Sequence, residues 1–319
     1  MVSSDDVRAA YRLILGREPE SNEVLAHLSR RCKSLAELRH QFLNSFEFRM
    51  TTTVPDLAKP LDWLPMPIET AAAPAESAQM LSRIERYWRE LDGAEPTEAP
   101  LQLHLREGSM PSDFGEAEKL FYGSGKAVVQ IFQRASERCG ISLRDYKVCL
   151  ELGAGVGRLT VWLSELFPKI LAADISQRRL DLSQRALRRF RCSNVEHHHV
   201  ATIDSVAALP DFDAFFSMIV LQHNPPPVIA ILLKTILGKL RPGGIAYFQV
   251  PTFIKNYTFT IDGDLHQAPE RGMEMHAIPQ KPLFEILEGC GCRLLEIRED
   301  PWTNSNVVIS NSILVKKSA

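Results

Sequence analysis

Glycines and acids in one short stretch of the chain could together hold a nucleoside. Gly153, Gly155 and Gly157 follow an apolar run that ends in Glu151, and apolar residues then recur at helical spacing. A strand that leads through a glycine turn into a helix is the nucleotide-binding corner of a doubly wound sheet. Asp174 ends a second apolar run about 20 residues further on, where a carboxylate can accept both hydroxyls of a ribose. The spacing therefore predicts a nucleoside-containing ligand at this corner.

Two histidines could move a proton beside that ligand. His223 lies in the loop after a fourth apolar run, at the edge of the sheet where ligands bind. His276 lies in an insertion over residues 251–281 that also carries aromatic and acidic side chains. A positioned imidazole can accept a hydroxyl proton, so we expect His223 to be a general base and His276 to be the second candidate. The alternative for His223 is a structural hydrogen bond to the loop backbone.

Polar residues in the same two loops complete the expected acceptor site. We expect Gln222 and Asn224, on either side of the first histidine, to contact the acceptor, together with Tyr257 and His266 from the insertion. Aromatic rings mixed with acids and histidines suit a polar, ring-shaped acceptor such as a sugar.

The chain must alternate strands and helices to bring these loops to one edge. Short apolar runs predict strands at 148–151, 170–173, 194–200, from 212 toward 223, and at 245–250. Amphipathic segments predict helices between them, and residues 293–298 and 307–315 would form an antiparallel closing pair. This order indicates an α/β protein with a doubly wound, mostly parallel sheet, helices on both faces and an antiparallel last strand.

The segment Glu-Leu-Gly-Ala-Gly-Val-Gly-Arg over 151–158 resembles motif I of the class I S-adenosylmethionine-dependent methyltransferases. A dinucleotide fingerprint would need a third small residue where Arg158 stands. Asp174-Ile-Ser resembles the acidic loop after their second strand, and the turn over 240–244 resembles the one before their fifth strand. The resemblance covers about residues 120–319. It implies their Rossmann-like fold, S-adenosylmethionine as the cofactor and methyl transfer as the activity.

The resemblance also implies which residues contact the cofactor. Glu151 suits its ammonium group, and Asp174 suits its ribose. A helix over 116–139, broken at Gly123-Ser-Gly125, would bring two residues to the methionine end. The expected cofactor contacts are Tyr122, Ser124, Glu151, Gly153, Ala154, Gly155, Gly157, Arg158, Asp174, Ile175, Thr202, Ile203, Ser217 and Met218.

The first 50 residues form a separate predicted unit of three helices, with Ser4 and Ser34 as helix caps. Its pattern, from Tyr11 through Leu-Gly-Arg-Glu-Pro to Phe48, resembles a phycobilisome-linker-like domain of bacterial polysaccharide-related proteins. The alternative is a plain three-helix unit. The resemblance implies a carbohydrate acceptor and a protein partner for this unit. Proline-rich residues 51–78 predict a linker, and 79–319 would be the methyltransferase domain, with amino-terminal helices over 79–119 and a core over 120–319.

Composition excludes several other functions. The net charge is −2, which disfavours nucleic-acid binding, and we interpret the arginines between 178 and 191 as a solvated helix face. No apolar stretch is long enough to span a membrane, and the first residues lack the apolar core expected of a signal peptide. Six scattered cysteines are typical of a reduced, cytoplasmic protein. Histidines 197–199 alternate between the faces of a predicted strand, so they cannot share one ion, and we expect no metal.

These expectations converge on an S-adenosylmethionine-dependent methyltransferase that acts on a hydroxyl of a sugar or glycan precursor. Two alternatives stay open. One is a methyltransferase for another small metabolite. The other is a non-catalytic relative that binds the cofactor or a partner as a scaffold.

Overall fold

The computed structural model describes residues 2–45, 47–48, 67–94, 114–266, 274–305 and 307–319. The chain divides into two compact units, Met1–Pro65 and Met66–Ala319. The expected linker residues 51–66, the stretch 95–113 and insertion residues 267–273 lie outside the described residues.

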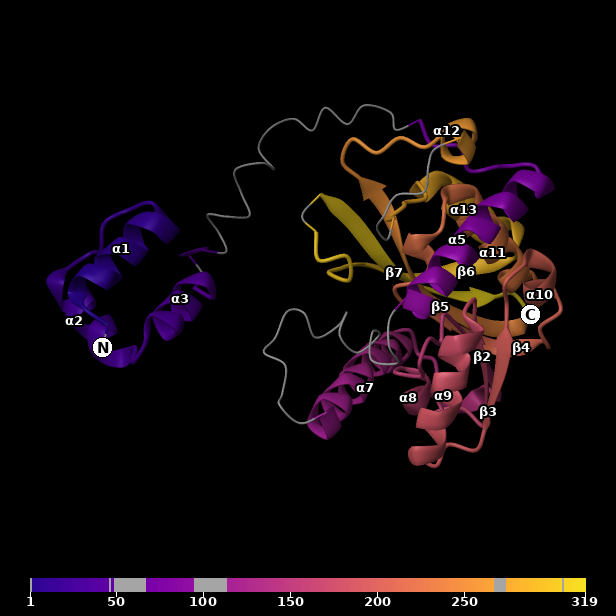
Figure 1. Ribbon diagram of the computed structural model, residues 1–319, viewed down its shortest axis with the longest axis horizontal. Coiled ribbons are helices and arrows are strands. Elements are labelled where there is room, and N and C mark those ends of the chain that lie inside the picture. Colours follow the sequence, from indigo (N-terminus) through magenta and orange to yellow (C-terminus); the bar gives the residue numbers. More distant parts are fainter. Residues whose placement is uncertain (1, 46, 49–66, 95–113, 267–273, 306) are drawn as a thin grey trace. The chain divides into compact units, whose positions relative to one another are not determined.

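The smaller unit contains the three expected helices, α1 (Ser4–Leu15), α2 (Asn22–Arg31) and α3 (Leu35–Leu43) (Figure 1). Ser3 caps α1 in place of the expected Ser4, because Asp6 lies three residues after Ser3 and completes a reciprocal capping box. Ser34 caps α3 as expected. The rings of Tyr11 and Phe42 pack edge to face, with centroids 4.9 Å apart, inside the small core.

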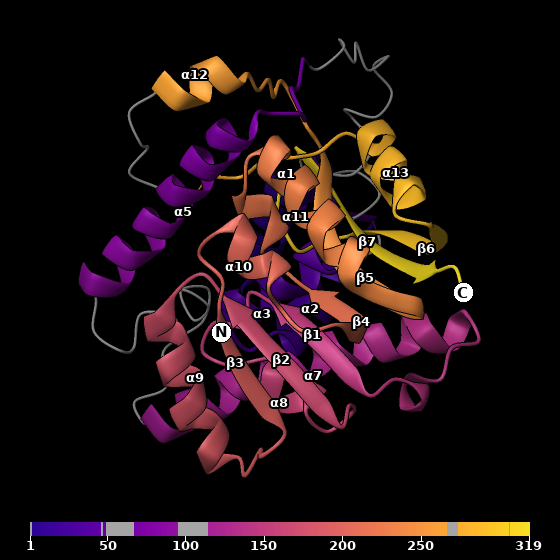
Figure 2. The same cartoon turned by 90° about the vertical axis from the view of Figure 1, so that its right-hand side faces the viewer.

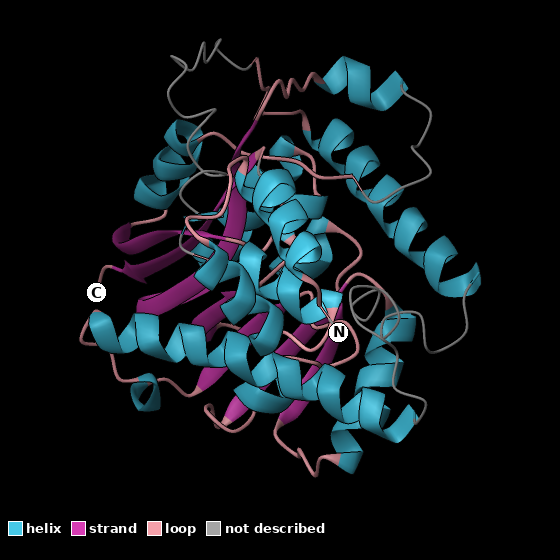
Figure 3. Cartoon of the chain, turned by 90° about the vertical axis from the view of Figure 1, so that its left-hand side faces the viewer, coloured by secondary structure: helices cyan, strands magenta, loops and turns pink. Residues whose placement is uncertain are grey.

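The larger unit is built on a seven-stranded sheet in the order β3-β2-β1-β4-β5-β7-β6 (Figures 1 and 3). Strands β1 to β5 run parallel, and β7 pairs antiparallel with both β5 and β6. This confirms the predicted doubly wound α/β sheet and its antiparallel closing pair. The strands are β1 (Val148–Leu152), β2 (Lys169–Asp174), β3 (Val195–His199), β4 (Phe212–Ser217), β5 (Leu240–Ile254), β6 (Cys292–Asp300) and β7 (Val308–Lys317).

Helices cover both faces of this sheet, because the central strands are apolar on both sides. Side chains of α5 (Pro74–Ala94), α11 (Pro226–Lys239) and α13 (Gln280–Gly289) enter one core, and α11 and α13 are seen together in Figure 2. Side chains of α7 (Phe114–Arg138), α8 (Thr160–Leu163) and α9 (Gln177–Arg189) enter the other core. The remaining elements are α10 (Ile203–Ala207), α12 (Ile261–His266) and two short 3-10 turns, η1 (Leu143–Asp145) and η2 (Leu221–His223).

The predicted break at Gly123-Ser-Gly125 is wrong, because α7 runs through it without interruption. A β-carbon on Gly125 would lie 2.2 Å from the carbonyl oxygen of Arg158. Glycine is therefore present because α7 crosses closely over the start of α8, and it does not end the helix.

The segment before α5 belongs to the fold of the larger unit. Ile68 forms a β-bridge with Phe259, and the Phe259 amide donates to the Pro67 carbonyl at 3.0 Å. The Glu69 carboxylate accepts from the Ile261 amide at 2.6 Å. Residues 67–78, which we expected to be linker, thus contain a strand contact and the first turn of α5.

The insertion after β5 begins as an extension of the strand. β5 continues to Ile254, which pairs with Val308 on β7, so the first residues of the insertion are sheet. In the part of the chain that the structure describes, no helix is long and apolar enough to cross a membrane.

The close helix crossing predicts opposite outcomes for two glycines on α7. Gly125→Ala should destabilise the fold by about 1–3 kcal/mol, because the new methyl group overlaps a carbonyl that cannot move away easily. Gly123→Ala is the matched control, since a β-carbon there meets nothing within 4 Å. It should stabilise the helix by roughly 0.5–1 kcal/mol. Urea unfolding of both variants measures the difference, and equal shifts would contradict this account of the crossing.

The contacts of residues 67–69 predict where the chain can be shortened. A chain beginning at Met66 should unfold cooperatively near the temperature of the full chain, because it keeps every contact of the larger unit. A chain beginning at residue 76 should melt lower, because it loses the bridge to Phe259 and the bond to Ile261. Calorimetry compares the three chains. Insolubility of the chain from Met66 would show that the first unit is required for folding.

Candidate active site

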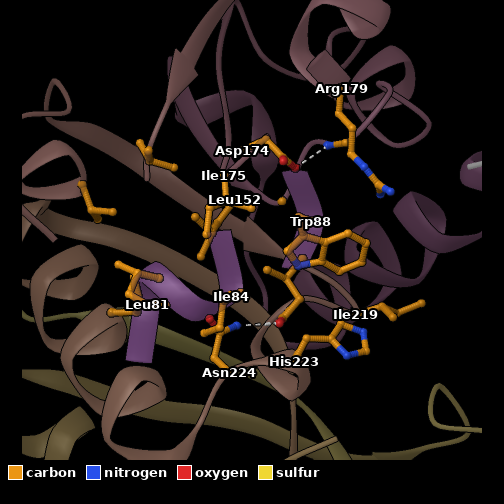
Figure 4. A pocket seen from close by; sticks show the side chains of 16 residues that line it. Leu81, Ile84, Trp88, Leu152, Asp174, Ile175, Arg179, Ile219, His223 and Asn224 are labelled. Carbon is orange, nitrogen blue, oxygen red and sulfur yellow. Dashed lines mark hydrogen bonds between the residues drawn. The ribbon is translucent and has the colours of Figure 1, made fainter. Parts of the chain in front are cut away.

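A pocket lies at the carboxyl ends of the parallel strands and holds about 730 Å³ of space, part of it open to solvent (Figure 4). Its walls come from α5, from the turns after β1 and β2, and from the loop after β4. Most of its lining is apolar. The lining residues are Leu81, Ile84, Trp88, Leu152, Gly153, Gly155, Asp174, Ile175, Arg179, Val200, Val206, Ile219, Val220, His223, Asn224 and Leu232.

The glycine turn after β1 presents open backbone to this pocket. Gly153, Gly155 and Gly157 all have positive φ, as the spacing predicted. A β-carbon on Gly153 would lie 2.1 Å from the Val220 side chain, so packing requires that glycine. A β-carbon on Gly155 would meet nothing within 4 Å. The free space over Gly155 is where a ligand can approach the backbone closely.

Asp174 is buried at the end of β2, beside the turn. Its two oxygens accept from the amides of Gly155 and Ser176, each at 2.8 Å. Burial raises the pKa of Asp174, while these two amides lower it. A carboxylate has about four lone-pair positions, so two bonds leave room for the paired hydroxyls of a ribose.

Glu151 lies behind the turn, inside β1, and is 1% exposed. Its Oε2 atom has no hydrogen-bond partner among the described residues. Burial raises the pKa of Glu151 to about 7, with the Thr160 hydroxyl acting in the opposite direction. A buried acid in this state favours a nearby cationic ligand group, because that charge would hold the carboxylate in its ionised form.

Helix α5 contributes a wall that the sequence did not reveal. The Trp88 ring lies between two pocket residues, with the Arg179 guanidinium 4.4 Å from its centroid and the His223 ring 6.2 Å away (Figure 4). Asp92, one turn further along α5, accepts from Arg179 Nε at 2.8 Å and from the Ser176 hydroxyl at 2.5 Å. The amphipathic pattern of α5 predicted a helix, but it gave no sign of which element the helix would face.

The arginine cluster on α9 is therefore not uniformly solvated. Arg179 lines the pocket, and its Nη2 atom is buried with no hydrogen-bond partner in the described part of the chain. A buried guanidinium donor without an acceptor is costly, so this atom is available for a ligand oxygen or nitrogen. The solvated-face interpretation missed this residue because its partner, Asp92, is 87 positions away.

His223 lines the pocket after β4, as its place in the sequence predicted. Its Nδ1 atom lies 3.1 Å from the Glu274 carbonyl oxygen, and its Nε2 atom lies 3.3 Å from the Gln222 amide nitrogen. A carbonyl can only accept, so Nδ1 carries the proton and Nε2 keeps its lone pair. Burial lowers the pKa of His223 to about 4, so the imidazole is neutral at physiological pH.

Of the other expected acceptor contacts, Asn224 lines the pocket and donates to the Val220 carbonyl at 2.8 Å. Gln222 is buried beside His223. Tyr257 does not line the pocket, and its hydroxyl lies 2.7 Å from Nδ1 of His276, the second candidate base, which does not line the pocket either. His266 is exposed on α12, where it pairs with Asp262.

Several expected cofactor contacts lie outside the pocket lining because other elements use their side chains. The Tyr122 hydroxyl donates to the Val156 carbonyl at 2.9 Å, and Ser124 accepts from Arg158 at 3.3 Å. These contacts join α7 to the turn before α8, outside the pocket lining. Thr202 caps α10, and the Ser217 hydroxyl donates to the Leu152 carbonyl at 3.1 Å. Ala154, Ile203 and Met218 pack in or against the hydrophobic cores, and Glu151 and Gly157 also lie outside the pocket lining.

Residues 149–244 match a family of proteins described as "Methyltransferase domain". The match covers β1 to the turn in β5, and it includes the glycine turn, Asp174 and His223. It spans less than half of the chain. No curated protein matches this sequence.

Several solved structures are similar to this chain. Magnesium protoporphyrin IX methyltransferase (ChlM) from Synechocystis PCC 6803 with bound SAM is 15% identical, with a TM-score of 0.49, over 78% of this chain and 100% of that one. A SAM-dependent methyltransferase from Methanosarcina mazei is 19% identical, with a TM-score of 0.41, over 54% and 92%. TehB from Haemophilus influenzae is 15% identical, with a TM-score of 0.42, over 54% of this chain and 57% of its own.

The residues at the pocket fit S-adenosylmethionine. Asp174 can take its ribose, the open space over Gly155 lets the cofactor approach the backbone of the turn, and the apolar walls suit an adenine ring. Glu151 lies behind the turn, outside the pocket lining, and its orphaned Oε2 atom suits a positive charge nearby. When bound, the cofactor supplies an electrophilic methyl group on sulfur.

The open space over Gly155 predicts a selective binding defect. Gly155→Ala should weaken S-adenosylmethionine binding by about tenfold or more, which corresponds to ~1.4 kcal/mol, because the methyl group occupies the ligand's approach to the backbone. Calorimetric titration measures the affinity. Gly140→Ala is the matched control, since Gly140 also has positive φ and open space around it but lies outside the pocket lining. Equal affinities in the two variants would show that the ligand does not approach Gly155.

Proposed function

We propose that this S-adenosylmethionine-dependent methyltransferase domain transfers the methyl group of the cofactor to a hydroxyl of a sugar or glycan precursor. His223 acts as the general base. The observation that carries the proposal is a neutral imidazole at the pocket wall, whose Nε2 lone pair is held only by a 3.3 Å bond to Gln222. A hydroxyl is a poor nucleophile until its proton is accepted, whereas amine and thiol acceptors need less help.

Methyl transfer from a sulfonium is an in-line displacement, so the protein acts mainly by positioning. Asp174 and the turn at Gly155 would hold the nucleoside of the cofactor on one side of the pocket. His223 lies on the other side, and its Nε2 lone pair can accept the acceptor's hydroxyl proton as the new oxygen–carbon bond forms. The fixed Nδ1–H bond to the Glu274 carbonyl stabilises the imidazolium that results.

Polar side chains around His223 support a carbohydrate acceptor. Asn224 is a buried amide beside it in the pocket lining, and amides pair well with sugar hydroxyls, while the amide of Gln222 binds His223 and Gln249. The resemblance of the first helical unit to domains on polysaccharide-related proteins points to the same substrate class. A second candidate is an acceptor with an apolar face, because Ile84, Trp88 and Ile219 line the same pocket.

An acceptor screen tests this proposal. The full chain would be incubated with S-adenosylmethionine carrying a labelled methyl group and with sugars, sugar nucleotides, phenols and amines. Label in sugar hydroxyls supports the proposal. Label only in phenols or other apolar acceptors supports the second candidate, and saturable cofactor binding without any transfer would indicate a scaffold.

Removal of the base should lower turnover without weakening cofactor binding. His223→Asn should lose roughly 10²–10⁴-fold in kcat, because a base contributes about that much and the amide cannot replace it. Calorimetry should show near-normal affinity for S-adenosylmethionine. His27→Asn, on the exposed face of α2, is the control. Normal turnover in His223→Asn would exclude His223 as the base.

The low pKa of His223 predicts an unusual acid limit for turnover. The folded pKa of about 4 lies below the ordinary value of 6.5, so the base form persists as the pH falls through 6. With saturating cofactor, kcat should therefore hold between pH 7 and about pH 5 and fall only near pH 4. A pH profile of kcat measures this limit. A fall centred near pH 6.5 would show a base with an unperturbed pKa.

A further inference from the structure

The insertion after β5 holds a hydroxyl, an imidazole and a carboxylate in line. The Tyr257 hydroxyl lies 2.7 Å from His276 Nδ1, and His276 Nε2 lies 3.1 Å from Glu274 Oε2. An ionised carboxylate can only accept, so Nε2 carries a proton, and Nδ1 can accept the proton of the tyrosine hydroxyl. The His276 ring also packs edge-on against Tyr257 and Phe259, at centroid distances of 6.0 and 5.8 Å. We call these three residues, Tyr257, Glu274 and His276, the insertion array.

Two residues of the insertion array, Glu274 and His276, attach it to the loop after β4. The side chain of Glu274 binds His276, and its backbone carbonyl accepts from His223 Nδ1 at 3.1 Å. The His276 amide donates to the Gln222 carbonyl at 2.8 Å, which fastens the segment to the loop after β4. A change in the backbone conformation at Glu274 would therefore move the carbonyl that orients the pocket histidine.

The other ring nitrogen of His223, Nε2, is held by Gln222, whose side chain is anchored to the sheet. The Gln222 side-chain amide donates to Nε2, and its oxygen accepts from Gln249 Nε2 at 3.0 Å. Gln249 also donates to the Ser310 hydroxyl at 2.6 Å, and its oxygen accepts from the Ile219 amide at 3.0 Å. Each amide has one orientation that satisfies all of these bonds. The weakest of them, at 3.3 Å, is the one that an acceptor hydroxyl would replace.

We infer that Tyr257, Glu274 and His276 are positioning residues that fix His223 in its Nδ1–H tautomer, with the Nε2 lone pair directed at the acceptor. The inference rests on the proposed function for its effect on turnover, but the tautomer itself is independent of that function. A histidine base in the wrong tautomer loses its activity, because the lone pair then points away from the substrate.

An ion pair between α12 and α5 lies close to the insertion array. Asp264 on α12 pairs with Arg83 on α5 at 2.9 Å, and it interacts electrostatically with Glu274 and His276. Burial raises the pKa of Asp264, and the Arg83 charge lowers it. Helix α5 thus supports the insertion through Arg83.

The experiment uses the full chain bound to S-adenosylhomocysteine, with nitrogen-15 in its histidines. In the wild type, nuclear magnetic resonance should show His223 protonated only at Nδ1. Glu274→Gln and Tyr257→Phe should each give a mixture of tautomers, because the first weakens the acceptor for His276 and the second removes its hydroxyl partner. Turnover should fall by roughly 10- to 100-fold in kcat, with the KM for the cofactor little changed, because a small misplacement of a base costs about that much.

The control is Glu285→Gln on α13, which makes the same chemical change at an exposed ion pair. It should leave the His223 tautomer and kcat unchanged. Tyr257→Phe keeps the ring and its packing, so it guards against simple misfolding. An unchanged His223 tautomer in both array variants overturns the inference, even if their turnover falls, because the array would then act on its own.

Failure of the proposed function gives a different result. If His223→Asn keeps normal turnover while Glu274→Gln still mixes the His223 tautomers, the positioning contact is real and the base lies elsewhere. If the wild type already shows a mixture of tautomers, the array does not fix His223, and the inference is overturned.

Discussion

The Asp174 carboxylate is the contact on which the pocket depends. It joins the amide of Gly155, in the turn after β1, to the amide of Ser176, at the start of α9. The carboxylate thereby fixes the distance between two loops that follow neighbouring strands. Burial disfavours the ionised acid, and the two amide bonds favour it, so the carboxylate is stable only while both loops keep their positions. A ligand that binds its remaining lone pairs strengthens the same arrangement.

The sequence predicted the sheet well, because the signals for its elements are local. Apolar runs of strand length, the glycine turn and Asp174 lie within one stretch of about 30 residues, and a βαβ unit folds on that scale. His223 followed from the rule that loops at carboxyl ends of parallel strands bind ligands. Each of these predictions needed only short-range patterns and one rule of topology.

The remaining pocket wall depends on contacts between distant parts of the chain, so composition could not reveal it. Asp92 binds Arg179 across 87 positions, and this pair brings Trp88 over the pocket. The same limit applied to Gly125. In the sequence, a glycine required by a close helix crossing cannot be told from a glycine that ends a helix. Tyr122 and Ser124, which we expect to contact the cofactor, do not line the pocket, because their side chains join α7 to the turn before α8.

Backbone strain at Ile219 shows how firmly the loop after β4 is held. Ile219 has a φ of 60°, a left-handed conformation that a β-branched residue adopts at a cost of about 1–3 kcal/mol. The Gln249 side chain accepts from its amide and donates to both Gln222 and Ser310, so β5 and β7 together hold the strained residue. The strain places the Ile219 side chain in the pocket wall and directs the chain onward to His223. If Ile219 adopted an unstrained backbone conformation, its side chain and the following residues would point elsewhere. The directional hydrogen bonds of the buried Gln249 side chain oppose that change, as apolar packing alone would not.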